Sequence, residues 1–386
     1  MSAYIPLSVP TLKGNELKYV KECIDTEWVS SAGKYVELFE QKIAEYTGSK
    51  YAVACVNGTA AIQVSLRLAG VKPSDEVIVS TLTFIASVNA ITYNNATPIF
   101  MDADKYYNLD SEKTIEFIKN ETVYKNGFTY NKNTDKKISA ILPVHVWGNA
   151  CWLDELINLC EERNIAVVED ACESLGTFYK EGKFNRKHTG AIGKLGCLSF
   201  NGNKIITTGG GGMILTDDQA LAEKAKYLTT QAKDDAIRYV HDEIGYNFRL
   251  TNIQSALGVA QLEQLPNILN RKKEIYNYYQ SAIENIDGLS ISKFPNYADN
   301  NHWMNLLKIE NKVYNEDREV LMKRLEEKGI QTRLVWALNH EQKPYKNCQY
   351  YKIENANKLV DNSLCLPSSS NLTNENLNKI ISQLNG

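Results

Sequence analysis

The residue of this sequence that most suggests chemistry is a lysine among uncharged neighbours. Lys204 stands in the run Ser-Phe-Asn-Gly-Asn-Lys-Ile-Ile-Thr-Thr over residues 199–208, and four glycines follow at 209–212. Apolar crowding disfavours the ammonium form of a lysine, so a neutral amine becomes available that can attack a carbonyl and hold a Schiff base. The glycines would let the backbone approach a ligand closely. The alternative is a surface lysine beside a flexible turn, so the surroundings of Lys204 must decide.

Three further candidate residues follow short apolar runs that we expect to be buried strands. Asp170 comes after the run 165–169, and its carboxylate could hold a protonated ring nitrogen or could cap a following helix. Phe84 could stack on a flat ring or belong to the core. His145 is either a polar or ring-stacking residue of a site or a histidine whose hydrogen bonds are satisfied in the core.

The segment Asn57-Gly58-Thr59-Ala60-Ala61 could hold an anion. It follows the expected strand 51–56, and a glycine turn that leads into a helix presents free N–H groups and the positive end of the helix dipole to a phosphate. The same residues are equally typical of a plain turn with an N-cap.

The elements expected to position these residues form an α/β fold. Apolar residues at helical spacing indicate two helices before the first strand, and Gly48 would end the second. Short apolar runs then alternate with helical stretches, which predicts a mostly parallel sheet with helices on both faces. The expected strands are 51–56, 76–80, 97–101, 139–144, 165–169, 195–200 and 212–216. In such sheets ligands bind at the carboxyl ends of the strands.

The length and the change of texture along the chain predict two domains. We expect a large domain over residues 1–262 and a smaller α+β domain over 263–386, with polar helices at 267–286 and 317–328. The polar stretch 122–137 interrupts the alternation and is predicted to be a surface excursion.

Composition argues against several classes of function. The formal net charge is −3 and the 43 basic residues form no dense block, so neither a nucleic acid nor a membrane surface is an expected partner. The eight cysteines contain no C-x-x-C pair, and no run approaches the length of a membrane span. We therefore expect a soluble, cytoplasmic protein with reduced cysteines and no metal site.

A phosphate cradle, an aromatic face, a carboxylate and a lysine are together the groups that pyridoxal phosphate requires. The chain resembles the sugar-nucleotide aminotransferases of the DegT/DnrJ/StrS family, which are fold type I pyridoxal phosphate enzymes, over nearly its whole length. The stretches that carry the resemblance are 33–36, 39–40, 57–61, 83–86, 168–173, 199–204 and 245–254.

The resemblance implies roles for four residues around the cofactor ring. Lys204 would bind the cofactor covalently and move a proton, Asp170 would pair with the pyridine nitrogen, and Phe84 would stack on the ring. Glu173 stands where the family commonly has a glutamine near the ring hydroxyl. This departure puts one hydrogen bond in question, because two acceptors can meet only with a proton between them.

The resemblance also implies a homodimer with two shared active sites. Thr59, Ala60 and Ser199 would hold the phosphate, joined by the partner subunit's Asn247. The four glycines at 209–212 replace the Gly-Glu-Gly-Gly usual in the family. The missing glutamate is not one of the implied cofactor contacts, so we expect no loss of activity.

Within the family, the segments 28–31, 201–208 and 241–247 look most like enzymes that aminate a 4-keto-6-deoxy-N-acetylhexosamine nucleotide in bacillosamine and legionaminic acid synthesis. L-Glutamate would be the amino donor and UDP the expected nucleotide, with a GDP- or dTDP-linked sugar of the perosamine type as the alternative.

A nucleotide-sugar substrate also needs residues that hold its phosphates and its sugar. Candidate substrate contacts are Arg249, Arg333, His340 and His145, although a solvated charge is an equal interpretation of the first three. A pyridoxal phosphate enzyme of different chemistry, such as a sugar dehydratase, and a non-catalytic regulator are the competing classes. The presence of both the lysine and the aspartate disfavours them.

Overall fold

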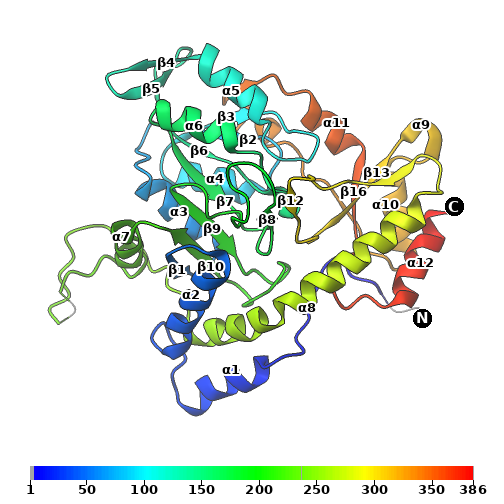
Figure 1. The fold of residues 1–386 in the computed structure, drawn as a ribbon, viewed down its shortest axis with the longest axis horizontal. Helices are drawn as coiled ribbons and strands as arrows, with labels where there is room; N and C mark the ends of the chain where they lie inside the picture. Colours follow the sequence, from blue (N-terminus) through cyan, green and yellow to red (C-terminus); the bar gives the residue numbers. More distant parts are fainter. Residues whose placement is uncertain (1–3, 236, 386) are drawn as a thin grey trace.

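The computed structural model describes residues 4–235 and 237–385, and its central feature is a ten-stranded sheet (Figure 1). The strand order is β1-β10-β9-β7-β6-β2-β3-β15, and the hairpin β4–β5 joins through β5 to β6. The strands are β1 (Tyr51–Cys55), β2 (Glu76–Ser80), β3 (Thr97–Met101), β4 (Thr122–Lys125), β5 (Phe128–Asn131), β6 (Lys137–Leu142), β7 (Ala166–Asp170), β9 (Leu195–Ser199), β10 (Gly212–Thr216) and β15 (Tyr350–Tyr351).

The sheet is mostly parallel, as the sequence predicts. The strands β9, β7, β6, β2, β3 and β15 run in one direction, whereas β10 is antiparallel to both β9 and β1. The seven strands expected from apolar runs are all present; three have the predicted bounds, and the ends of the other four differ by at most two residues.

Helices cover both faces of this sheet because its strands are apolar on both sides. Along β2, Val77 and Val79 belong to one hydrophobic cluster and Ile78 to another, since alternate side chains of a strand point to opposite faces. The helices of this region are α2 (Lys34–Thr47), α3 (Gly58–Leu68), α4 (Ile85–Tyr93), α5 (Ser111–Asn120), α6 (Asp154–Glu162) and α7 (Gln219–Thr229). Of these helices, α3, α4 and α7 contribute to the hydrophobic cluster that contains Val77 and Val79. The buried residues of α2 belong to another cluster, on the opposite face of the sheet.

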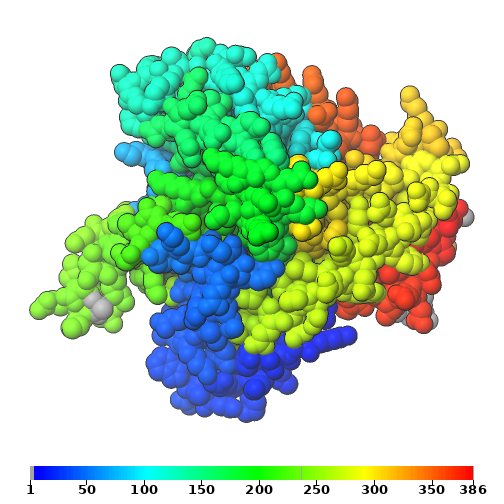
Figure 2. All heavy atoms as spheres, viewed as in Figure 1, coloured from blue at the N-terminus to red at the C-terminus, as the bar shows by residue number. Residues whose placement is uncertain are grey.

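The C-terminal part contains a second, antiparallel sheet. Its order is β11 (Leu289–Ile291), β13 (Asn305–Ile309), β16 (Ser363–Leu366) and β14 (Arg333–Leu334). A cluster that includes Ile5 joins this sheet to the helices α10 (Arg318–Glu327) and α12 (Asn374–Leu384). Smaller elements are α1 (Glu16–Asp25), α9 (Asn311–Tyr314), α11 (Asn355–Asp361), η1 (Val146–Gly148), η2 (Asn339–Glu341) and the pair β8 (Phe178–Tyr179) with β12 (Ala298–Asp299). In Figure 2 this part packs directly against the rest of the molecule.

The long helix α8 (Asn252–Ile283) connects the two parts (Figure 1). It begins well before the predicted residue 267, because Thr251 and Gln254 form a capping box. The proposed domain boundary at residue 262 falls inside this helix, and β15 returns the chain to the large sheet.

Two details of the sequence prediction have a clear outcome. Gly48 ends α2 in the left-handed conformation, as expected. Within the stretch 122–137, which was predicted to be a surface excursion, β4 and β5 form a hairpin that pairs with β6. Among the described residues, no helix is both long and apolar enough to cross a membrane.

Candidate active site

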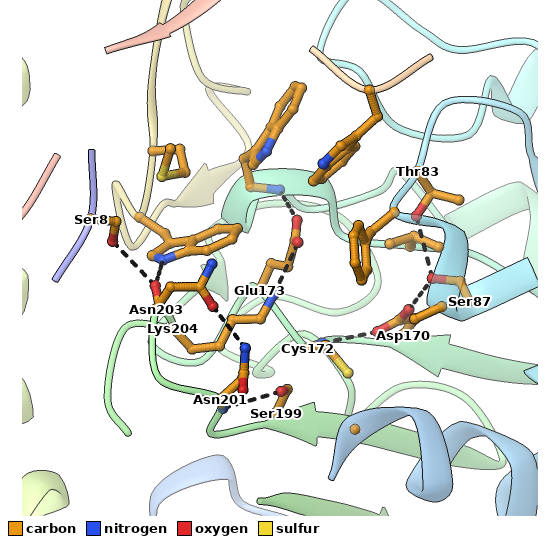
Figure 3. A pocket seen from close by; sticks show the side chains of 18 of the residues that line it. Ser8, Thr83, Ser87, Asp170, Cys172, Glu173, Ser199, Asn201, Asn203 and Lys204 are labelled. Atoms are coloured by element: carbon orange, nitrogen blue, oxygen red, sulfur yellow. Dashed lines mark hydrogen bonds and ion pairs between the residues drawn. The ribbon is translucent and has the colours of Figure 1, made fainter. Parts of the chain in front are cut away.

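A cavity of about 450 Å³ lies where the parallel strands end, and it brings together most of the predicted cofactor residues (Figure 3). The predicted residues that line it are Lys204, Asp170, Glu173, Phe84, Thr59, Ser199 and Arg333. In Figure 3, Asp170 and Ser87 lie on one side of the cavity and Lys204 and Asn203 on the other.

The amine of Lys204 is held by a carboxylate and an aromatic ring. Its Nζ lies 3.0 Å from Glu173 Oε1 and 4.3 Å from the ring centroid of Trp303. The Trp303 indole donates to the carbonyl of Asn203 at 2.7 Å, which fixes the ring over the lysine. Burial raises the pKa of Glu173, while the neighbouring Lys204 ammonium and the Trp147 backbone N–H act in the opposite direction. Lys204 is therefore a largely buried amine held in one orientation and not a free surface lysine.

Asp170 ends β7 and offers a fixed carboxylate to the cavity. Its Oδ2 accepts from Ser87 Oγ at 2.6 Å and its Oδ1 accepts from the Cys172 backbone N–H at 3.1 Å. The residues that follow form turns and not a helix, so capping does not explain this aspartate. An ordered buried carboxylate suits a partner that carries a proton on nitrogen.

Phe84 presents an aromatic face to the same cavity. It precedes α4, and 51% of the residue is exposed, which is unusual for a phenylalanine that would serve only as core. Its ring centroid lies 6.0 Å from that of Trp336. The exposed ring is available to stack on a planar group.

The segment predicted to hold a phosphate lies at the start of α3. The Asn57 side chain caps the helix by accepting from the Ala60 N–H at 2.8 Å, and the first turn leaves further N–H groups without helical partners. A Cβ at Gly58 would lie 2.7 Å from Cys172 Sγ and 2.9 Å from Ser199 Cβ, so only glycine fits here. Thr59 and Ser199 line the cavity, whereas the predicted contact Ala60 is buried and is not part of the cavity lining.

His145 does not reach the cavity. It is fully buried, Nε2 lies 2.9 Å from Glu169 Oε2, and Nδ1 accepts from the Cys151 N–H at 3.0 Å. Both ring nitrogens are therefore satisfied inside the fold. The structure supports the core-histidine alternative over a site residue.

Three other predicted contacts also lie outside the cavity lining. Arg249 is largely buried and forms an ion pair with Glu40 at 2.7 Å. His340 Nδ1 lies 2.7 Å from Thr81 Oγ1, and burial lowers the pKa of this histidine. Asn247 is exposed, as a residue that serves a partner subunit would have to be. Of the four substrate candidates, only Arg333 lines the cavity.

Comparison with known proteins decides the family. Residues 10–385 match the DegT/DnrJ/EryC1/StrS aminotransferase family. The chain belongs to this family. It is a pyridoxal phosphate-dependent sugar-nucleotide aminotransferase with the fold type I architecture.

Relatives in this family agree over almost the whole chain. A GDP-perosamine synthase of Escherichia coli O157:H7 is 38% identical over 99% of this chain and 98% of its own length. EpsN of Bacillus subtilis (strain 168), described as a pyridoxal phosphate-dependent aminotransferase, is 35% identical over 100% of this chain and 96% of its own length. The solved structure of the aminotransferase TlmJ from Streptoalloteichus hindustanus superposes with a TM-score of 0.87 at 25% identity, covering 99% and 98% of the two chains.

The cavity fits the cofactor of the family. The α3 N-terminus and Ser199 suit its phosphate, Asp170 its ring nitrogen, Phe84 its ring face and Lys204 its aldehyde. When bound, pyridoxal phosphate supplies a carbonyl that takes up amino groups and a ring that accepts electrons.

Sequence reasoning missed the tryptophans of this site. Trp147, Trp303 and Trp336 all line the cavity, and the chain has only five tryptophans. Trp147 stands two positions after the predicted residue His145, which was a usable signal. Trp303 and Trp336 come from the C-terminal part, so their place depends on how that part packs on the large sheet.

Proposed function

We propose that this enzyme transfers the amino group of L-glutamate to the C4 ketone of a nucleotide-linked 4-keto-6-deoxyhexose. The observation that carries the proposal is the convergence of Lys204, Asp170 and Phe84 on one cavity that also contains an arginine free to hold a diphosphate. A sugar dehydratase without the lysine would lack the first of these groups.

The chain's own residues divide the work of such a transfer. The amine of Lys204 would take a proton from Cα of glutamate and deliver it to C4′ of the cofactor. Glu173, 3.0 Å from this amine, stabilises its protonated form. The carboxylate of Asp170, held by Ser87, keeps a ring-nitrogen proton in place, which favours negative charge on the substrate carbon in the transition state.

Arg333 supports the binding of a diphosphate. It lines the cavity from β14 and, within the described residues, makes no ion pair with a carboxylate. Arg249 differs, because Glu40 already neutralises it. An unpaired guanidinium can bind two phosphate oxygens at once.

The nucleotide is the finer part of the proposal, and two candidates have specific support. The segments 28–31, 201–208 and 241–247 resemble enzymes that use UDP-4-keto-6-deoxy-N-acetylglucosamine, which would make a precursor of bacillosamine or legionaminic acid. The relatives instead favour a GDP-linked sugar, because GDP-perosamine synthases of three organisms are 32–38% identical to this chain. Perosamine is also a 4-amino-4,6-dideoxyhexose, so both candidates require the same reaction at C4.

We also propose a homodimer in which the partner subunit's Asn247 completes each phosphate site. The segments 233–235 and 237–246 project from the body after α7 (Figure 2), and Ile237, Tyr239 and Ile244 expose large apolar side chains there. An exposed apolar projection of this kind is typical of an interface between subunits.

The deciding experiment supplies ¹⁵N-labelled L-glutamate, pyridoxal phosphate and either UDP-4-keto-6-deoxy-N-acetylglucosamine or GDP-4-keto-6-deoxymannose to the purified protein. We expect mass spectrometry to find ¹⁵N at C4 of one of them, with the better substrate identifying the nucleotide. A reaction without glutamate is the control. Cofactor binding without ¹⁵N transfer to either sugar would contradict the proposal.

A further inference from the structure

Two tryptophans of the cavity wall lack the hydrogen bond that a buried indole usually makes. Trp147 is 2% exposed, Trp336 is half-buried, and both line the cavity. Within the described part of the chain, neither indole N–H donates a hydrogen bond. Trp303 and Trp152 do, at 2.7 Å to a backbone carbonyl and 2.6 Å to a carboxylate. Neither indole nitrogen is among the sealed polar atoms of the described residues that lack a partner, so both N–H groups are accessible and can donate to a molecule bound in the cavity.

The two indoles form a rigid, stacked pair. Their ring centroids are 4.7 Å apart and their planes differ by 26°. Tyr107 contacts Trp147 edge-on at 5.1 Å, and Phe84 lies 6.0 Å from Trp336. The pair is therefore a fixed apolar surface that carries two hydrogen-bond donors.

This surface lies beside the reacting amine. The backbone N–H of Trp147 donates to Glu173 Oε2 at 2.8 Å, and the other oxygen of the same carboxylate contacts Lys204 Nζ. Trp147 has φ 52° and ψ 26°, a left-handed conformation that is rare for a bulky side chain. Such strain persists only where surrounding structure enforces it, and it is concentrated at functional sites.

We propose that the Trp147–Trp336 pair is the wall that holds the hexose of the substrate. The face of Trp336 that is not stacked on Trp147 would pack against the apolar C–H edge of the sugar ring, and the two N–H groups would donate to sugar oxygens. This inference rests on the proposed transfer to a nucleotide-linked keto sugar.

The covalent connectivity of such a substrate favours the hexose over the base as the occupant. C4 must come to the cofactor beside Lys204, so the carbons next to C4 and their substituents are the atoms nearest to this amine. The base is attached through ribose, two phosphates and C1, on the far side of the sugar ring. A wall tied through Glu173 to Lys204 therefore meets the sugar and not the base.

The test compares the two half-reactions in the holoenzyme, because only one of them involves the sugar. For Trp336→Phe and Trp336→Ala, we expect kcat/KM for the keto sugar to fall about 10-fold and 30-fold further than kcat/KM for glutamate, since Phe keeps a ring but loses the donor. Trp152→Phe is the matched control, because Trp152 does not line the cavity. Equal losses in both half-reactions would overturn the inference.

A binding measurement guards against a variant that folds poorly. For the wild type, calorimetry compares the affinity of UDP-N-acetylglucosamine with that of UDP, and the affinity of GDP-mannose with that of GDP. For the nucleotide that the enzyme uses, we expect the nucleotide sugar to bind more tightly than the nucleoside diphosphate alone. Trp336→Phe should reduce that improvement about tenfold. An unchanged improvement would overturn the inference while amination by the wild type still stood. Absence of ¹⁵N transfer by the wild type would instead remove the proposed function beneath it.

Discussion

At the scale of single residues, the site depends on how each charged side chain is held. Lys204, Glu173 and Asp170 line one cavity with little exposure of their side chains, and every one has a hydrogen-bond or ion-pair partner. An unpartnered charge there would be expensive. The partners therefore explain why the fold tolerates three ionisable groups beside a hydrophobic cluster.

Asp170→Asn tests the carboxylate without changing its shape. The amide oxygen can still accept from the Cys172 N–H and the amide NH2 can donate to the Ser87 hydroxyl, so we expect the melting temperature to change little. It cannot hold a ring-nitrogen proton as an anion can, and kcat should fall by about 10²–10³. Steady-state kinetics and calorimetry on the same preparation check both expectations. A loss of stability with normal kcat would show that this aspartate is structural.

Residue types and their spacing were enough to place Lys204, Asp170 and Phe84 at the cavity, because each lies at or shortly after the carboxyl end of a strand whose burial the apolar pattern indicates. His145 follows a strand too, but it turns inward to Glu169. No local sequence pattern distinguishes a side chain that points into the cavity from one that points into the core. For His145 the outcome depends on a carboxylate 24 positions away.

At the scale of elements, the sheet was predictable and the cavity wall was not. Short apolar runs specify buried strands, so their positions could be found with an error of one or two residues. The wall made by Trp303 and Trp336 requires the C-terminal part to fold over the carboxyl ends of the strands. That packing joins residues far apart in the chain, and the sequence contains no periodic signal for it.

Gly58→Ala tests the contact between α3 and the strand ends. The added methyl group would lie 2.7 Å from Cys172 Sγ, so the first turn of α3 must move away from the phosphate site. We expect the protein to lose about 1–3 kcal/mol of stability and its affinity for pyridoxal phosphate to fall about tenfold, or 1.4 kcal/mol.

Gly202→Ala is the matched control for this variant. It lies in the same region, but the nearest atom to its added Cβ is 3.9 Å away. Absorbance titration with the cofactor and urea unfolding compare the two variants. Equal affinities for the cofactor would mean that the α3 N-terminus is not the phosphate site.

At the scale of the whole molecule, acid should destabilise the fold through a buried histidine. Burial lowers the pKa of His188 from 6.5 to about 4. Between these values the unfolded chain binds a proton that the folded chain does not, so stability falls as the pH falls through this window. The contribution is on the order of 3 kcal/mol.

His188→Gln removes this proton-linked term and keeps an acceptor for the Gly176 N–H. Between pH 7 and pH 4, the free energy of unfolding of the variant should therefore decrease less than that of the wild type. Urea unfolding at both pH values measures the difference. Parallel losses in the two proteins would show that His188 is not responsible.

The proposed dimer can be tested by mixing two defective subunits. Lys204→Ala lacks the reacting amine, and Asn247→Ala should bind the cofactor less tightly. In a hybrid dimer with shared sites, one of the two sites has both residues. Random exchange should then restore about a quarter of the wild-type activity at limiting cofactor. No recovery from a mixture in which hybrids are shown to form would mean that each subunit completes its own site.

The most direct test of the whole account is the identity of the residue that bonds to the cofactor. Borohydride makes the bond between pyridoxal phosphate and an enzyme amine permanent, and peptide mass mapping then locates it. We expect the added mass on Lys204 alone, and no labelling or transamination in Lys204→Ala. Label on another lysine, or normal turnover in that variant, would contradict the account.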